Sequence, residues 1–133
     1  MKSVDARLTR GLPMGARIDV CDNSGAKKIK IFSVKGGKTV KRRYPAASVG
    51  DLVNASIIKG KPGMKKQVVQ AVIVRQRRPY RRLTGERIKF EDNAAVVLRD
   101  EKGAPKGTIF KGAIAKEAAD RWPEIAKVAS IVV

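Results

Sequence analysis

The chain has 133 residues, of which 43% are hydrophobic and 5% aromatic, and its formal net charge is +18. This hydrophobic content excludes an intrinsically disordered chain, because enough apolar surface is available to offset the chain entropy of folding. There is no histidine and only one cysteine, so the usual general base near neutral pH and the ligands of a zinc site are missing, and we expect no enzyme, metal site or cofactor.

Short β-branched runs separated by Gly, Pro, Asn and Asp predict strands along most of the chain. The first strand is expected over Ala16–Cys21, followed by a type I turn at Asp22–Gly25 and a second strand over Lys28–Val34. The pair Gly36-Gly37 is expected to turn this strand into a basic return strand that ends near Tyr44.

The two strongest strand predictions are Asp51–Lys59 and Gln67–Arg75, on either side of a Gly-Lys-Pro-Gly loop. Residues Arg75–Arg82 continue beyond this apolar run, turn at Leu83–Glu86 and return through Arg87–Phe90. This pattern predicts a basic β-ribbon that projects from the body of the protein.

The last third of the chain mixes strand and helix signals. Strands are expected over Asn93–Arg99 and, in short form, over Thr108–Phe110. A helix is expected over Ala113–Arg121, and Pro123 both ends it and can open a second short helix as its first residue. The final segment, Ser130–Val133, is predicted to return to the sheet as a strand.

These elements predict a mainly β protein: a small OB-like or SH3-like β-barrel of five or six strands with a protruding ribbon and two short C-terminal helices. A β-sandwich stays open as the alternative. We expect one domain over 1–133, made of an N-terminal extension (1–15), the barrel with a ribbon near 75–90 (16–110) and a helical segment (111–133). No signal peptide is expected, and no apolar run approaches the ~18 residues of a membrane-spanning helix.

The net positive charge is confined to the first ninety residues. Residues 1–90 contain 23 Lys or Arg and five Asp or Glu, a net charge of +18, whereas residues 91–133 contain seven of each and are neutral. Such a field attracts phosphate-bearing partners, although scattered lysines can also be a solvated face. The candidate nucleic-acid contacts form two clusters: Lys27, Lys28, Lys30, Lys41, Arg42 and Arg43, then Arg75, Arg77, Arg78, Tyr80, Arg81 and Arg82.

An arginine guanidinium can donate two parallel hydrogen bonds to a phosphate. Contacts with phosphates position a protein on a nucleic acid but do not recognise its sequence. The residue types of the two clusters are therefore compatible with either RNA or DNA as the partner. Tyr80 either stacks on an unpaired base or packs under the arginine stems. The lone Cys21 is interpreted as a small buried thiol, which fits a reducing cytosol. The stretch Gly36–Thr39 resembles the end of a phosphate-binding loop, but it lacks the earlier glycine and is interpreted as a hairpin turn.

Five stretches, in matching order and spacing from about residue 16 to the C-terminus, resemble the universal large-subunit ribosomal protein L-fourteen family. They are Val20–Lys28, Ala47–Asp51, Ala71–Arg75, Ile88–Val96, and Gly107–Phe110 leading into Ala115–Glu117. The longer N-terminal lead and the stretch Lys41–Ala47 are similar to the archaeal or eukaryotic branch, and the lack of an extended tail favours the archaeal one.

This resemblance implies a five-stranded barrel, a protruding ribbon and two small C-terminal helices. It also implies a cytoplasmic protein on the intersubunit face of the large ribosomal subunit. There, family members contact large-subunit rRNA, help form a bridge to small-subunit rRNA and touch neighbouring ribosomal proteins. In several lineages the C-terminal part is also a docking place for anti-association factors.

The neutral C-terminal segment independently favours protein contact, and its candidate contact residues are Ile114, Ala118, Trp122 and Ile125. The alternative is that these residues cap the barrel core. A free-standing OB-type RNA-binding protein or translation factor is a competing function, but the strands offer almost no stacking aromatic beyond Phe32. An RNA-processing enzyme is a third hypothesis, which the lack of histidine opposes.

Overall fold

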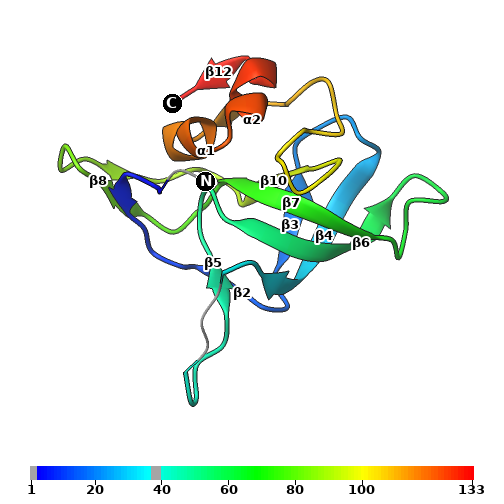
Figure 1. The fold of residues 1–133 in the computed structure, drawn as a ribbon, viewed down its shortest axis with the longest axis horizontal. Helices are drawn as coiled ribbons and strands as arrows, with labels where there is room; N and C mark the ends of the chain where they lie inside the picture. The colour runs from blue at the N-terminus through cyan, green and yellow to red at the C-terminus, as the bar shows by residue number, and fades with distance from the viewer. Residues whose placement is uncertain (1–2, 37–39) are drawn as a thin grey trace.

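The computed structural model describes residues 3–36 and 40–133, and its centre is a closed barrel with the strand order β10-β3-β4-β6-β7 (Figure 1). Strands β3 and β10 run parallel, and the other neighbouring pairs run antiparallel. Closure gives every barrel strand two neighbours, which confirms a barrel rather than a sandwich. The barrel strands are β3 (Arg17–Val20), β4 (Ala26–Val34), β6 (Leu52–Gly60), β7 (Val68–Arg75) and β10 (Ala94–Val97).

Alternation of apolar and polar residues explains how the strands face the core. On β4, Ile29 and Ile31 are fully buried, whereas Lys28 and Lys30 between and beside them are exposed. All four residues of β10 are buried. Helices α1 (Lys116–Arg121) and α2 (Pro123–Val128) lie over one end of the barrel, where α1 packs against β7 (Figure 1). The core is therefore aliphatic, built mainly from Ile, Val and Ala.

Short strands outside the barrel form three small sheets. The projecting ribbon is a three-stranded antiparallel sheet, because the N-terminal segment adds a strand to it. Two further pairs lie beside the barrel, one antiparallel and one parallel. These strands are β1 (Ala6–Arg7), β8 (Tyr80–Arg82) and β9 (Arg87–Ile88) in the ribbon, β2 (Leu12–Pro13) with β5 (Ala46–Ala47), and β11 (Ala113–Ile114) with β12 (Ile131–Val132).

The C-terminal helices are present, with one boundary different from the expectation. Pro123 is the first residue of α2, as predicted. The first helix was predicted from Ala113, but residues Ala113–Ile114 pair with Ile131–Val132 as strands, and α1 begins only at Lys116. Tertiary pairing has overridden helix propensity here. The last segment is a strand, but its partner is β11 and not a strand of the barrel.

The predicted basic return strand ending near Tyr44 is wrong for the residues that are described there. Residues 40–45 contain no strand; a turn closed by a hydrogen bond from the Arg43 N–H to the Val40 carbonyl (2.9 Å) occupies the segment. Most of the predicted Gly36-Gly37 hairpin turn lies in 37–39, outside the described residues. The predicted strand at Thr108–Phe110 is reduced to a single bridge between Phe110 and Asp22.

In the part of the chain that the structure describes, no helix is long and apolar enough to cross a membrane.

Candidate nucleic-acid interface

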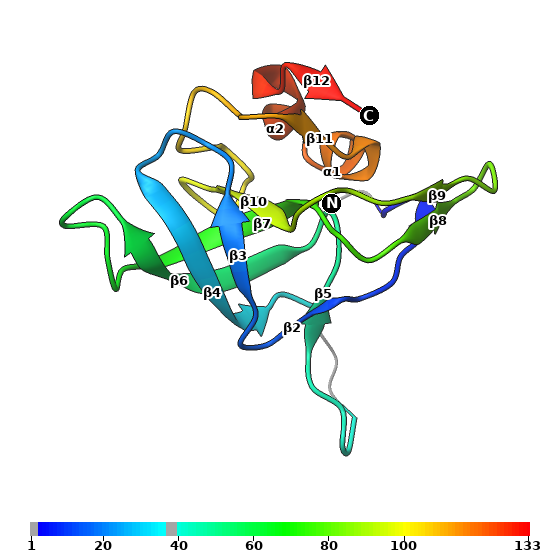
Figure 2. The ribbon, with the colours of Figure 1, turned by 180° about the vertical axis from the view of Figure 1, so that it is seen from behind.

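Three projections carry exposed cations away from the barrel in different directions. In Figure 1 the ribbon of β8 and β9 extends to the left, the β6–β7 loop to the right, and residues 40–45, directly before β5, downward. The view from behind in Figure 2 shows the same divergence, with α1, α2 and β12 on the opposite side from the lower loop.

The outward face of the ribbon carries a row of arginines. Arg81 on β8 is the cross-strand partner of Arg7 on β1 and of Arg87 on β9. Directly paired residues point to the same face of a sheet, and all three side chains are exposed. We call these three residues the arginine row. They line a groove of about 270 Å³ together with Leu8, Thr9, Pro79 and Tyr80.

Like charges placed directly opposite one another on a sheet destabilise it. The arginine row therefore has an electrostatic cost in the free protein, and an anion bound across the three strands would remove that cost.

The inward face of the ribbon is held against helix α1 by one carboxylate. Glu117 accepts hydrogen bonds from the Tyr80 hydroxyl (2.8 Å) and from Arg82 Nε (2.6 Å), and Arg82 Nη2 also donates to the Val133 carbonyl. Burial and the bond to Glu117 raise the pKa of Tyr80, and the same carboxylate raises the pKa of Arg82. This network fixes the ribbon to the helical segment.

The prediction that Tyr80 stacks on a base is wrong, because its ring is only 2% exposed. The other interpretation, in which the ring packs inside the protein, is the one that the fold supports. Arg82 is also removed from the candidate contacts, since its side chain is 16% exposed and is bonded to Glu117.

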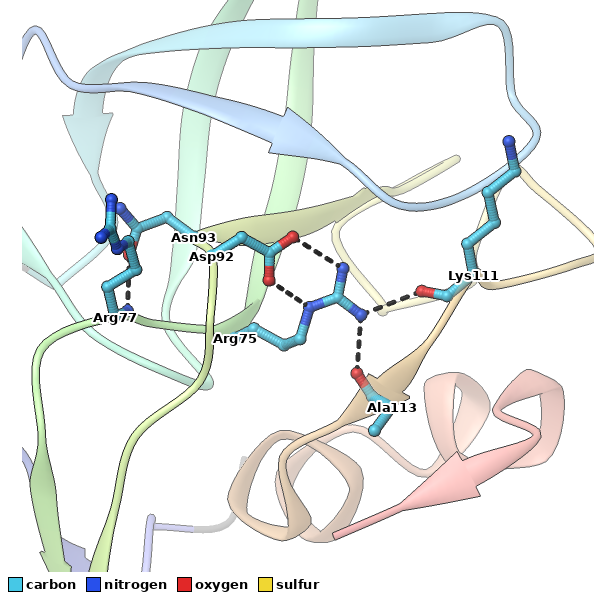
Figure 3. A network of polar contacts seen from close by, with 6 residues as sticks. All are labelled: Arg75, Arg77, Asp92, Asn93, Lys111 and Ala113. Carbon is cyan, nitrogen blue, oxygen red and sulfur yellow. Dashed lines mark hydrogen bonds and ion pairs between the residues drawn. The ribbon is translucent and has the colours of Figure 1, made fainter.

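Arg75 is a second structural arginine (Figure 3). Its guanidinium forms a two-point pair with Asp92 (2.9 and 3.2 Å) and donates from Nη1 to the carbonyls of Lys111 (2.9 Å) and Ala113 (2.8 Å). These bonds connect the end of β7 to the segment that leads into β11. With a side chain only 12% exposed, Arg75 is not available to a phosphate.

Asn93, directly before β10, satisfies a backbone group near the end of β7, because its Oδ1 accepts the Arg77 N–H at 2.8 Å (Figure 3). This bond uses only the backbone of Arg77, so its side chain stays exposed. The remaining predicted basic contacts are likewise on the surface: Lys27, Lys28, Lys30, Lys41, Arg42, Arg43, Arg78 and Arg81.

Several exposed cations of the projections were not among the predicted contacts. Arg7 and Arg87 enter the site only through strand pairing. The β6–β7 loop exposes Lys61, Lys65 and Lys66, and Lys59 is exposed near the end of β6. The backbone of this loop is attached to the neighbouring turn by a bond from the Lys61 N–H to the Gly25 carbonyl (3.0 Å). The charge run of this loop is visible in the sequence and could have identified it.

The four predicted protein-contact residues are all buried, which corrects that prediction: Ile114, Ala118 and Ile125 are fully buried and Trp122 is 4% exposed. They close the barrel core, as the alternative proposed. Apolar side chains that do face outward in the neutral part of the chain are Ile109, Ile131, Val132 and Val133.

Cys21 is buried, as predicted, and burial raises the pKa of its thiol to about 11. The thiolate is therefore scarce at neutral pH, and the residue behaves as a small apolar side chain. Among the described residues no group of three His, Cys, Asp or Glu side chains is arranged to hold a metal ion.

The fold and its surface together define a small, strongly basic β-barrel protein. Many of its exposed cations lie on the barrel strand β4 and on the projections, whereas residues 91–133 are neutral overall. Comparison with known proteins identifies the family within this class. A family model described as Ribosomal protein L14p/L23e matches residues 11–133. The chain belongs to this family, and it is a ribosomal protein of the large subunit.

Individual relatives agree over the full length and come from archaea. Large ribosomal subunit protein uL14 of Nanoarchaeum equitans is 53% identical over 133 residues, covering all of both chains. The uL14 protein of Picrophilus torridus is likewise 53% identical over 133 residues, again covering all of both chains. That of Methanococcus vannielii is 47% identical over 132 residues, 99% of each chain. These matches confirm the resemblance, its archaeal character and the predicted location in the large ribosomal subunit.

Proposed function

We propose that this protein is a non-enzymatic structural constituent of the large ribosomal subunit that binds large-subunit rRNA through its cationic projections. The observation that carries the proposal is the arginine row, in which Arg7, Arg81 and Arg87 stand side by side on one exposed face. Arginine is suited to this role because its planar fork donates two parallel hydrogen bonds to a phosphate. The ribbon that carries the row is anchored by Glu117, so its geometry is already set before binding.

The partners follow from the directions of the projections. The ribbon, the β6–β7 loop and residues 40–45 point in different directions (Figure 1), which favours contacts with separate RNA segments. We therefore propose that the protein holds separate RNA segments, including small-subunit rRNA across an intersubunit bridge. A single domain with an N-terminal extension that completes the ribbon fits this arrangement.

We further propose that the neutral helical side contacts neighbouring ribosomal proteins and an anti-association factor. Support comes from the exposed apolar residues Ile131 and Val132 on β12 and Val133 after it, in a part of the chain (residues 91–133) whose net charge is zero. The contact would thus involve β12 and not the buried residues first predicted.

Replacing Arg7, Arg81 and Arg87 together with glutamine is expected to weaken binding to large-subunit rRNA. The log–log dependence of affinity on salt should become shallower by about 3, given roughly 0.9 per phosphate contact on a duplex. Binding measured by fluorescence anisotropy across a salt series gives both quantities. Stability should not fall, because the substitution also removes like-charge repulsion within the sheet.

The matched control removes the same charge from the neutral part of the chain by changing the exposed Lys102, Lys106 and Lys127 to glutamine. This variant should keep the wild-type salt dependence. If both triple variants lost affinity equally, binding would follow total charge alone, and the arginine row would have no specific role.

A further inference from the structure

The loop between β4 and β5 exposes an aromatic ring at the end of a cationic run. Tyr44 is 76% exposed, whereas Tyr80 and Trp122 are buried and Phe32 is 43% exposed. Exposure of most of an aromatic side chain to water is unfavourable, because burial of its large apolar surface would lower the free energy. Such a ring on a projecting loop therefore indicates a surface that a partner covers.

The electrostatic surroundings of Tyr44 identify the kind of partner. Lys41, Arg42 and Arg43 precede it directly, and all three are exposed. The sequence has no acidic residue between Asp22 and Asp51, so no carboxylate from this stretch neutralises them. A purely apolar protein partner would have to desolvate these charges, whereas a polynucleotide offers phosphates and an aromatic base together.

The backbone holds the ring in a defined place. Arg42 has a φ of +69°, a left-handed conformation that is unfavourable for a residue with a side chain and concentrates at functional sites. Pro45 follows Tyr44, which restricts Tyr44 to extended conformations, and the Pro45 carbonyl accepts the Met14 N–H at 3.0 Å. The loop is thus anchored one residue after the ring.

We propose that Tyr44 is a stacking platform for an unpaired RNA base, with Arg42 and Arg43 binding the flanking phosphates. Recognition of single-stranded RNA commonly combines these two elements, and stacking accepts any base because every base has a π-face. The proposal rests on the proposed rRNA binding and adds to it the class of RNA that this loop takes. It also supplies, from a loop, an aromatic contact beyond Phe32, the exposed aromatic residue of the barrel strands.

The test uses the full chain and two labelled probes: a mixed-sequence single-stranded RNA of twelve nucleotides and a duplex with the same number of phosphates. Tyr44→Ala should weaken single-strand binding by about tenfold or more. It should leave duplex binding and both salt dependences unchanged, because no charge is removed. Tyr44→Phe should bind as the wild type does, since stacking needs the ring and not the hydroxyl.

Leu83→Ala is the matched control, because Leu83 is a 79% exposed apolar residue at the tip of the ribbon; this variant should bind both probes normally. Wild-type single-strand affinity in Tyr44→Ala, or an equal loss on both probes, overturns the proposal. If the arginine-row variant still loses RNA affinity in that case, the proposed function stands and Tyr44 serves a protein contact. If neither variant changes RNA binding, both proposals are wrong.

Discussion

Trp122→Ala is expected to lower the free energy of unfolding by about 3–5 kcal/mol, as for other large aromatic residues removed from a core. The ring is 4% exposed, and its Nε1 donates a hydrogen bond to the Gly50 carbonyl at 2.8 Å. It packs so closely on Gly103 that a methyl group at that position would lie 2.5 Å from the ring. Truncation therefore leaves a cavity and an unpaired carbonyl between the helices and the barrel. Denaturant unfolding of the purified chain measures the loss.

Lys127→Ala on the same helical segment is the control, because Lys127 is exposed and should change stability by no more than about 0.5 kcal/mol. A Trp122→Ala variant that unfolded at the wild-type denaturant concentration, yet lost a protein partner, would contradict the assignment. Such a result would support the prediction from the sequence that Trp122 contacts another protein.

Glu117→Ala is expected to destabilise the fold by about 3–5 kcal/mol, the cost of removing one partner from a buried charge pair. Its side chain is 4% exposed and accepts bonds from both Tyr80 and Arg82. Without the carboxylate, the Tyr80 hydroxyl and the Arg82 guanidinium stay inside the protein with unpaired donors. Thermal or denaturant unfolding gives the total effect.

A double-mutant cycle with Tyr80→Phe separates the contribution of the hydroxyl from that of the charge. Glu124→Gln is the matched control, because this exposed glutamate makes only a 3.3 Å surface pair with Lys127. Equal stability of the Glu117→Ala and Glu124→Gln variants would show that the ribbon is not held by this network.

The barrel could be predicted from the sequence because its signals are local. The alternation of apolar and polar residues predicts β4, and long β-branched runs predict β6 and β7. The observed boundaries of these strands, Ala26–Val34, Leu52–Gly60 and Val68–Arg75, lie within one or two residues of the expected ones. The start of α1 could not be predicted, since the pairing of β11 with β12 is decided by residues at the end of the chain.

The positive charge of residues 1–90 was also evident from the sequence, but the role of each arginine was not. Arg81 and Arg82 are neighbours, yet one faces outward and the other binds Glu117, 35 residues away. Strand alternation separates them, and only the packing of α1 shows which face is inside. Arg7 joins the site because β1 pairs with β8, a long-range pairing with no local signal.

The motif residues that carried the family resemblance hold the fold together. Asp22 Oδ2 accepts the Val97 N–H at 2.9 Å, and Asn23 Oδ1 accepts the Thr108 N–H at 2.8 Å. These bonds join the first turn to β10 and to the loop after it. Asp22 and Asn23 therefore have structural roles, whereas the arginine row lies on the ribbon, outside the five stretches that carry the resemblance, one of which begins at Ile88, next to Arg87.

Co-sedimentation of the tagged full-length chain with ribosomal subunits, at moderate and then rising salt, tests the central claim most directly. The protein is expected to sediment with large subunits, with little free chain, and to be released at lower salt when the arginine row is changed to glutamine. Finding the wild-type chain mostly free, or on the small subunit, would contradict it.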